Sequence, residues 1–423
     1  MLIDFRIRNY RSFKGEQSLS LEASRITEFP ENVFVEKTSE TRLLKAIAVY
    51  GANSSGKSNL LTGMGMMKHI VFSNFRLRAN ENLSYDPFLL DESSSIEPTG
   101  YEVFFSTSGK VFRYGFEHNS KVITREWLFD HTSGEEPLFV RVDDGIEVFD
   151  SFPEGFDLEK KTRDNGLFLA VVDQFNGKIA SKIIEWFNNF NSIDGLGHTD
   201  YRAITFEMLE NHETKDRLVE FYNDVDLGFK NIIINKKPFD PSTLQFVLPD
   251  ELVEQMTNDM EGKLMASFSS IHHFLDENKK VAKRSFNIRT QESAGTNKII
   301  DLSGPIFDTL QDGGVLIVDE LDAKLHPHLT ISLIKLFQFE KTNPNHAQLI
   351  FATHNTNILS MGRLRRDQIV FAEKDRQAST HIYPLSDYKI ENRKIRKDNS
   401  FEKDYLLGRY GGVPEIKDFI NYD

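Results

Sequence analysis

The stretch Gly51-Ala-Asn-Ser-Ser-Gly56-Lys57-Ser58 decides the fold; it follows the apolar run Ala46-Ile-Ala-Val-Tyr50 and precedes Asn59-Leu-Leu. It matches the phosphate-binding pattern G-x-x-x-x-G-K-[ST], with a buried-looking strand before it and a helix-compatible stretch after it. Such a loop wraps a triphosphate in backbone N–H groups, and its glycines let the chain approach the phosphate oxygens closely. Lys57 would reach the β- and γ-phosphates, and Ser58 would offer its hydroxyl to Mg²⁺. The alternative, a Gly/Ser turn that binds nothing, is disfavoured by this context.

Length and composition describe a globular protein of more than one lobe. With 423 residues the chain is too long for one simple core and fits two or three lobes. No window approaches 18 uncharged apolar residues, and the N-terminus has no signal-peptide layout, so we expect no membrane partner. The absence of cysteine excludes disulfides, thiolate catalysis and Cys-based zinc sites. It is consistent with a cytoplasmic location, which we expect.

Charge argues against uniform binding to nucleic acid. The chain has 51 basic and 64 acidic residues and a net charge of −13, which opposes tight non-specific association with a polyanion. Basic clusters still occur at Arg363-Leu-Arg365-Arg366 and within residues 389–397. We interpret both as solvated surface, with a patch for nucleic acid or a partner protein as the alternative.

The order of local patterns predicts three segments. Five short apolar runs between residues 101 and 149 are separated by Gly, Asn and Asp, which is typical of an antiparallel meander. The period then becomes helical, as in the face formed by Ile179, Ile183 and Phe187. We expect residues 1–175 to form the N-terminal part of an α/β head with an antiparallel β lobe, residues 176–285 a mostly helical insertion with a few strands, and residues 286–423 the C-terminal part of the head.

Two later strand-like runs end in residues that suit a nucleotide site. The first is Val315-Leu-Ile-Val-Asp319-Glu320, and the second is Gln348-Leu-Ile-Phe-Ala-Thr-His354. In the same chain as the loop, Asp319 is positioned to hold Mg²⁺, and Glu320 to orient and deprotonate an attacking water. His354 would sense the γ-phosphate, although a histidine standing alone is more often structural. Strands and helices alternating in this way imply a largely parallel sheet.

A further segment indicates the kind of nucleotide-binding protein. Gln291-Glu-Ser293-Ala-Gly295-Thr-Asn297 precedes a helix-like run, and its Glu-Ser-x-Gly-Thr is similar to the ABC signature. With Asn9-Tyr-Arg-Ser-Phe near the start, the chain resembles ABC-type ATPases of the RecF, SMC and overcoming-lysogenization-defect group. It is similar in particular to the standalone "AAA, ATP-binding" proteins of bacterial anti-phage and abortive-infection operons. The segments that carry this second resemblance are Pro87-Phe-Leu-Leu-Asp-Glu, Arg366-Asp-Gln-Ile-Val-Phe and Arg409-Tyr-Gly-Gly-Val-Pro.

The resemblance implies an ABC-type ATPase head whose sheet is mixed or largely parallel, with an antiparallel β subdomain and a helical insertion. It also implies that two heads close around ATP and Mg²⁺, because the signature helix of one subunit completes the site of the other. Ser293 and Gly295 would contact the γ-phosphate in trans, Asp322 would lie at the dimer interface, and Arg11 would reach the nucleotide. The other candidates are Gly51, Asn53, Gly56, Lys57, Ser58 and Asn59 for nucleotide binding, Ser58 and Asp319 for the metal, and Glu320, His354 and Lys57 for catalysis.

Two features depart from the family pattern. No glutamine can be assigned to the family's Q-loop, and Gln174 is only a weak candidate. Pro305 predicts that the helix after the signature is bent or split.

Only 69 residues follow His354, so we expect no Toprim nuclease of the overcoming-lysogenization-defect kind. The pair His326 and His328 is better explained by a packed loop than by a metal site.

We therefore expect an ATPase that dimerises around ATP, hydrolyses it, and controls an effector such as a co-encoded nuclease in anti-phage defence. A DNA-repair or recombination ATPase that acts directly on DNA is the first alternative, and DNA is accordingly a candidate partner. The second alternative is a scaffold that holds ATP without turnover. Assembly into oligomers larger than a dimer stays open.

Overall fold

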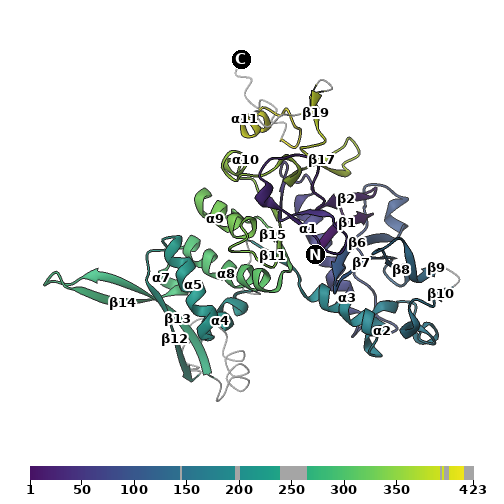
Figure 1. Cartoon of the computed structure of the whole chain (residues 1–423), viewed down its shortest axis with the longest axis horizontal. Coiled ribbons are helices and arrows are strands. Elements are labelled where there is room, and N and C mark those ends of the chain that lie inside the picture. The colour runs from purple at the N-terminus through teal and green to yellow at the C-terminus, as the bar shows by residue number, and fades with distance from the viewer. Residues whose placement is uncertain (143–144, 196–200, 239–263, 391–392, 395–399, 414–423) are drawn as a thin grey trace. The chain divides into compact units, whose positions relative to one another are not determined.

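The computed structural model describes residues 1–142, 145–195, 201–238, 264–390, 393–394 and 400–413 (Figure 1). The chain divides into two compact units. The first contains Met1–Gly197 and Ile306–Asp423, and the second contains His198–Pro305. The phosphate-binding loop belongs to the first unit and the signature-like segment to the second.

A six-stranded, mostly parallel sheet forms the centre of the first unit. Its strand order is β11-β15-β16-β5-β17-β18, and only β17 and β18 pair antiparallel. The strands are β5 (Ala46–Tyr50), β11 (Phe190–Asp194), β15 (Val315–Asp319), β16 (Gln348–Ala352), β17 (Ile369–Lys374) and β18 (Thr380–Pro384). Every residue of β5 and β16 is buried, which accounts for their continuous apolar sequences. The loops that follow β5, β15 and β16 therefore leave the same edge of the sheet.

Helices cover this sheet. Helix α1 (Lys57–Ser73) packs on β11, β15 and β16, while α9 (Pro327–Gln338) packs on β5 and β16. Helix α9 begins with a proline, whose missing N–H is not needed in the first turn, and the Nδ1 of His326 accepts a hydrogen bond from the His328 N–H at 3.2 Å. The other helices of the unit are α2 (Phe168–Gln174), α3 (Lys178–Asn188), α10 (Asn357–Met361) and α11 (Phe401–Leu406).

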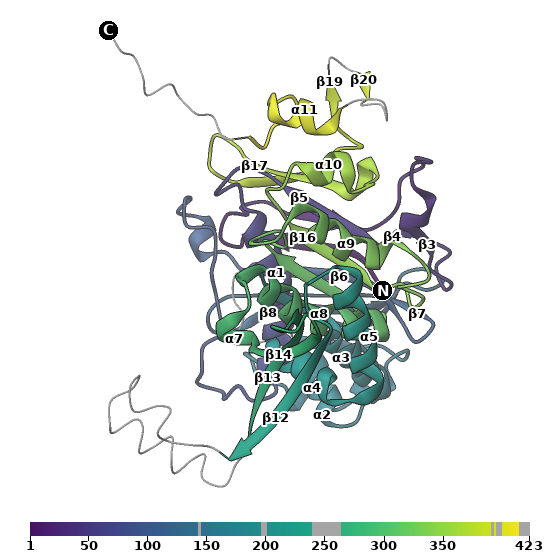
Figure 2. The same cartoon turned by 90° about the vertical axis from the view of Figure 1, so that its left-hand side faces the viewer.

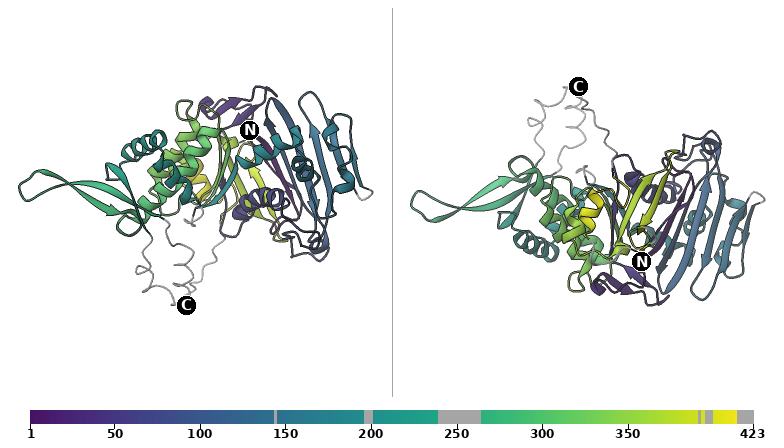
Figure 3. Two further views of the ribbon diagram at one scale, coloured as in Figure 1. Left: turned by 90° about the horizontal axis from the view of Figure 1, so that it is seen from below. Right: turned by 90° about the horizontal axis from the view of Figure 1, so that it is seen from above.

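A seven-stranded antiparallel sheet forms a second layer of the first unit (Figure 3). Its order is β10-β9-β8-β7-β6-β1-β2, with β1 (Leu2–Arg8), β2 (Gln17–Ser20), β6 (Thr99–Thr107), β7 (Lys110–His118), β8 (Ile123–Asp130), β9 (Glu136–Val142) and β10 (Gly145–Val148). Two small ribbons pair β3 (Val33–Val35) with β4 (Arg42–Leu44) and β19 (Lys389–Ile390) with β20 (Arg393–Lys394).

Polar and aromatic contacts tie the two layers together. The buried Gln348 side chain of β16 accepts a hydrogen bond from the Leu2 N–H at 2.7 Å and donates to the Leu2 carbonyl at 2.9 Å. Trp186 of α3 stacks on Phe105 of β6 with ring centroids 4.1 Å apart. The abundant phenylalanines largely serve this packing, and one continuous apolar core extends through both layers.

The second unit combines helices with a small sheet (Figure 2). It contains α4 (Arg202–Glu210), α5 (His212–Asp224), α7 (Ile288–Gln291) and the antiparallel sheet β12-β13-β14. The strands span Asn231–Pro238, Leu264–Leu275 and Val281–Asn287. Helix α8 (Ala294–Asp312) begins in this unit and continues into the first.

Helix α8 passes through Pro305 without splitting, contrary to one of the two outcomes that its sequence predicts. A proline lacks the N–H that would bond the carbonyl four residues earlier, here that of Asp301. The hydroxyl of Thr205 on α4 donates to the Asp301 carbonyl at 2.9 Å. Thr205 Oγ1 in turn accepts a hydrogen bond from the Gly304 N–H at 3.0 Å. Thr205 thus replaces the missing hydrogen bond.

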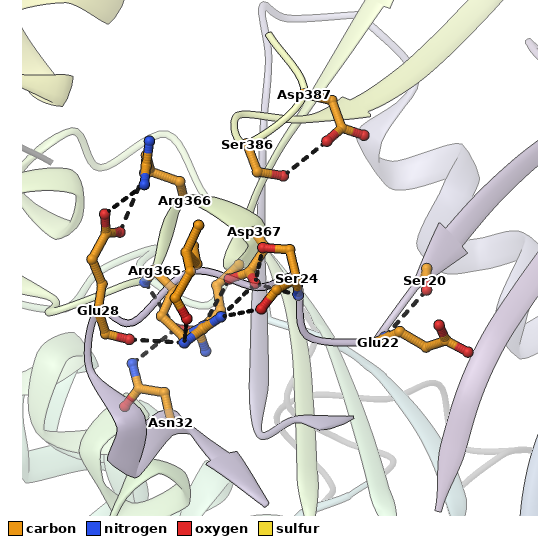
Figure 4. Close-up of polar contacts among 12 residues, drawn as sticks. Ser20, Glu22, Ser24, Glu28, Asn32, Arg365, Arg366, Asp367, Ser386 and Asp387 are labelled. Atoms are coloured by element: carbon orange, nitrogen blue, oxygen red, sulfur yellow. Dashed lines mark hydrogen bonds and ion pairs between the residues drawn. The ribbon is translucent and has the colours of Figure 1, made fainter. Parts of the chain in front are cut away.

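The predicted α/β head with an antiparallel β lobe is confirmed, and β6 to β10 form the expected meander. The interpretation of the Arg363–Arg366 cluster as solvated surface is wrong for Arg365, whose side chain is fully buried. Arg365 pairs with Asp367 at 2.7 Å and also donates to backbone carbonyls of residues 24–28 (Figure 4).

Candidate nucleotide site

The loop of residues 51–56 joins β5 to α1 and lies against β17 and β18. Gly56 has a φ of 106°, and a Cβ placed there would lie 2.2 Å from Thr380 Oγ1. A Cβ on Gly51 would lie 2.4 Å from the Ala372 carbonyl oxygen. Neighbouring strands therefore require both glycines. Within the loop and the first turn of α1, Asn53 and Ser58 are exposed and Asn59 is half-buried.

Lys57 is the first residue of α1, and its side chain lies within the loop. Its Nζ donates to the carbonyls of Gly51 at 2.8 Å and Ala52 at 3.0 Å. Burial lowers the pKa of Lys57, while the negative charges of three carboxyl groups partly offset that effect; they belong to Asp319, Glu320 and Asp322. The ammonium group therefore lies within electrostatic reach of the acids that follow β15.

Two hydroxyl residues outside the motif hold the loop in place. Asn59 Nδ2 donates to Ser12 Oγ at 2.9 Å. Thr380 Oγ1 donates to the Ser55 carbonyl at 2.9 Å and lies 2.8 Å from Ser12 Oγ, and the Thr380 N–H donates to the Ser12 carbonyl at 2.7 Å. These roles of Ser12 and Thr380 were not predicted from the sequence. Ser12 lies in the family-like Asn-Tyr-Arg-Ser-Phe segment, which is a signal for it, but Thr380 follows no recognisable pattern.

The acids after β15 occupy distinct positions. Asp319 ends the strand, and its Oδ1 is buried without a hydrogen-bond partner among the described residues. Glu320 has a φ of 51°, a left-handed conformation that costs a non-glycine residue about 1–3 kcal/mol. Asp322 lies in the following turn, where its carbonyl accepts a hydrogen bond from the Leu325 N–H at 3.0 Å. The fold thus maintains a strained backbone where the sequence places its candidate base.

His354 follows β16 at the same edge of the sheet. Its ring is exposed, yet partial desolvation lowers its pKa, and the nearby Lys57 charge lowers it further. The carboxyl groups of Asp322, Glu320 and Asp319 act in the opposite direction. The predicted sensor histidine, the loop lysine and the acids therefore share one electrostatic environment. All five belong to the first unit.

Arg11 lies beside the loop-supporting Ser12. It has a φ of 47°, and its guanidinium Nη2 is 3.2 Å from Asp86 Oδ2. The Arg11 N–H donates to the Asp86 carbonyl at 2.8 Å, and the guanidinium carbon lies 5.3 Å from the Tyr10 ring centre. The guanidinium of Arg11 thus contacts the Asp86 carboxylate, and contact between Arg11 and a nucleotide stays a prediction.

The signature-like segment forms a hydrogen-bonded turn before α8 in the second unit. Ser293 is exposed, and its Oγ accepts a hydrogen bond from the Thr296 N–H at 3.1 Å, as an N-cap residue does. Glu292 turns inward, where its carboxylate contacts Ser270 Oγ and lies 2.7 Å from His272 Nε2. Asn297 Nδ2 donates to the Ile288 carbonyl at 2.8 Å. Ser293 is thus exposed at the start of α8 with its hydroxyl hydrogen-bonded to Thr296, and Gly295 in the first turn of the helix is half-buried.

One acid at the site was not predicted. Asp194 ends β11, and its Cα pairs in parallel register with that of Asp319. Both residues line a cavity of about 830 Å³ beside α1, as does Glu320. Strand β11 is short and half-polar, and its residues were predicted as part of the helical insertion. In the sequence, only the aspartate after Ile193 could have indicated an acid at this site.

Gln174, the weak candidate for a Q-loop glutamine, ends α2, where its side chain donates to the Phe75 carbonyl at 3.3 Å.

The residues present fit ATP with Mg²⁺. Magnesium is commonly held by one or two carboxylates, a Ser or Thr hydroxyl, phosphate oxygens and water rather than by an all-protein cage. The buried, unpartnered Asp319 Oδ1 and the exposed Ser58 supply that donor set. Among the described residues no group of three or more His, Asp and Glu side chains could hold a metal by itself. Of the pair His326 and His328, His326 is the N-cap residue of α9.

Within the described residues, no helix is long and apolar enough to cross a membrane.

The strand-loop-helix arrangement and the acids at the ends of β15 and β11 define a P-loop ATPase of mixed α/β fold.

Comparisons with known proteins specify the family. A family model described as "AAA domain, putative AbiEii toxin, Type IV TA system" matches residues 46–360. This is most of the chain, and the protein belongs to that family. Among solved structures, the SMC head domain from Thermotoga maritima is similar at 14% sequence identity and a TM-score of 0.40, covering 92% of this chain and 99% of that one. No curated protein sequence matches the chain significantly.

Proposed function

We propose that this protein binds and hydrolyses Mg²⁺-ATP at sites that two copies build together, and that the resulting cycle of closure and opening controls an effector. The observation that carries the proposal is that the loop of residues 51–58, the acids after β15 and His354 meet at one edge of the parallel sheet, where Lys57 and His354 interact with the same three acids. The proposed location is the cytoplasm, and the proposed setting is defence against phage. The family description supports that setting by naming a toxin of a toxin–antitoxin system.

Each residue has a role that suits its position. Lys57 compensates phosphate charge, and binding of an anion would offset the desolvation of its ammonium group. Ser58 and Asp319 would hold Mg²⁺, which supplies positive charge to the β- and γ-phosphate oxygens when bound. Glu320 accepts the proton of the attacking water, and His354 contacts the γ-phosphate side of the site. Gly51, Asn53, Gly56 and Asn59 line the nucleotide-binding loop, with Arg11 approaching from the N-terminal turn.

Division of the site between two copies explains why ATP would control assembly. In this proposal the exposed Ser293 and the half-buried Gly295, at the start of α8, contact the γ-phosphate held by the loop of the other copy. Asp322 lies at the interface between them. A nucleotide that makes contacts in the closed dimer but not in separate chains shifts the equilibrium toward the dimer. Hydrolysis removes those contacts, so the bound nucleotide reports its state to whatever partner binds the dimer.

Phosphate release from purified protein tests the enzymatic part. We expect Mg²⁺-dependent release from ATP that is lost in Glu320→Gln, because an amide cannot accept the proton from water. Glu185→Gln, which changes an exposed acid of α3 outside the motifs, is a matched control and should leave the rate unchanged. Release that persists in Glu320→Gln would contradict the assignment of the base. No release from wild-type protein with normal ATP binding would favour the scaffold alternative.

Co-purification tests the effector. Tagged Glu320→Gln should retain a co-encoded partner protein when ATP is present, and Lys57→Ala should not, because only the former can stay closed. Equal recovery of the partner with both variants would show that its binding does not depend on nucleotide state.

A further inference from the structure

One hairpin of the second unit extends beyond the sheet to which it belongs. Strand β12 pairs with β13 only between Leu264 and Ile271. The next four residues of β13, through Leu275, pair with β14 alone, from Val281 to Arg284. Among the described residues this part of the hairpin is therefore a two-stranded ribbon, and it extends past β12 within its unit (Figure 1).

The ribbon concentrates positive charge in an acidic protein. Residues 279–289 contain five basic and no acidic residues, whereas the whole chain has a net charge of −13. Four of the basic residues, Lys279, Lys280, Lys283 and Arg284, belong to the ribbon, and Arg289 lies in the following helix α7; all five are exposed. The turn between the strands also carries Asp276 and Glu277, so residues 272–284 contain four basic and two acidic residues and have a net charge of +2.

None of these five side chains forms an ion pair with another described residue. The Arg363–Arg366 cluster behaves differently, since each of its arginines contacts a carboxylate, as Figure 4 shows for Arg365 and Arg366. In the ribbon, the guanidinium carbon of Arg284 lies 4.4 Å from the centre of the Phe274 ring. Stacking orders the guanidinium while leaving its N–H donors accessible to another molecule.

The cations project from both faces of the ribbon. Lys283 pairs across the strands with His273, and the next residue, Arg284, pairs with His272. Because consecutive strand residues point to opposite faces, Lys283 and Arg284 lie on opposite sides. A flat acidic protein surface would meet only one of them. The major groove of DNA is about 12 Å wide, admits a two-stranded ribbon and has phosphates along both walls.

The end of the ribbon adds an apolar pair. Leu275 and Val281 are cross-strand partners on the face of Lys283, and they are 65% and 70% exposed. Bases present apolar thymine methyl groups in the major groove, so an apolar tip between cationic edges suits that surface.

We propose that this ribbon, residues 272–284, binds duplex DNA by entering its major groove, with lysine and arginine side chains on phosphates along both walls. The four basic residues of the ribbon lie outside the proposed nucleotide site, so we expect their substitution to leave ATP binding unchanged. His272 at its base is different, because its Nε2 lies 2.7 Å from Glu292 of the signature-like segment.

Fluorescence anisotropy with a labelled 30-base-pair duplex of mixed sequence tests the proposal on the full chain. The test variant is Lys283→Ala/Arg284→Ala. The matched control is Lys121→Ala/Lys182→Ala, which removes two exposed lysines of the first unit. At low salt we expect the test variant to bind about tenfold more weakly than wild type, with the dependence of log K on log salt reduced by roughly two. The control should match wild type.

Three results would overturn the proposal. One is a wild-type protein that does not bind the duplex at 50 mM salt, and another is a test variant that binds as tightly as the control. The third is a test variant that changes self-association or capture of an acidic partner while DNA binding stays constant, which would make the ribbon a protein interface. Circular dichroism of the same preparations verifies that the variants fold, and their ATP binding separates this proposal from the proposed ATPase.

Discussion

Replacing Gly56 with alanine tests whether the packing of β18 on the phosphate-binding loop determines the loop's conformation. The new Cβ would lie 2.2 Å from Oγ1 and 2.7 Å from Cγ2 of Thr380, and 2.9 Å from Ser12 Oγ, at a φ of 106°. Thr380 can move away only by losing its contacts with the Ser55 carbonyl and Ser12 Oγ. Two neutral hydrogen bonds contribute about 1 kcal/mol each, and the strained backbone costs about 1–3 kcal/mol. We expect the free energy of unfolding of the first unit to fall by about 3–5 kcal/mol.

Urea unfolding followed by tryptophan fluorescence measures this change, because both tryptophans, Trp127 and Trp186, belong to the first unit. Gly109→Ala is the control, since Gly109 has a φ of 74° but no atom within 4 Å of a new Cβ. It should cost only the backbone conformational term, about 1 kcal/mol. The double variant Gly56→Ala/Thr380→Ala should recover part of the loss by removing the crowded atoms. If Gly56→Ala is no less stable than Gly109→Ala, close packing against β18 does not constrain the loop.

Three other substitutions test separate parts of the structure. Lys57→Ala should weaken binding of a fluorescent ATP analogue by about 10–150-fold, the effect of losing a charged hydrogen bond, and unchanged affinity would remove Lys57 from the site. Burial lowers the pKa of His118 from 6.5 to about 4 in the folded protein. As the pH falls below 6.5, the unfolded chain therefore takes up a proton before the folded protein does, and the free energy of unfolding decreases. The decrease at pH 5 is about 2 kcal/mol. His118→Phe should abolish this dependence in urea titrations at pH 7 and pH 5, and an unaltered dependence would assign it to another group. Arg365→Ala leaves the buried Asp367 uncompensated and should lower the free energy of unfolding by about 3–5 kcal/mol, whereas a change within 1 kcal/mol would show that the pair contributes little.

The position of a residue could be predicted from the local sequence where an apolar strand pattern ends directly in a polar, chemically suitable side chain. The apolar run before Gly51 and the apolar run before Asp319 are buried parallel strands, and their polar ends meet at one edge. That edge follows from the geometry of a parallel sheet, so Lys57, Asp319 and His354 could be brought together without coordinates.

Contacts between distant segments could not be predicted in this way. The support of the loop by Thr380 depends on the position of β18, whose sequence carries no signal for it. Arg365 looks like part of a surface cluster because its neighbours are charged, but Asp367 and backbone carbonyls satisfy it inside the protein. Strand β11 is short and half-polar, so its position beside β15, and hence Asp194, became evident only in the sheet.

The proposal that two copies share each ATP site is tested most directly by the mass of the protein in solution. Sedimentation velocity of Glu320→Gln with saturating Mg²⁺-ATP should show a dimer that is lost when ATP is withdrawn. The same variant carrying Ser293→Arg should stay monomeric while still binding ATP, because only the contact from the opposite copy is blocked. A Glu320→Gln protein that is monomeric in saturating ATP, or a dimer that Ser293→Arg leaves intact, would contradict a shared site.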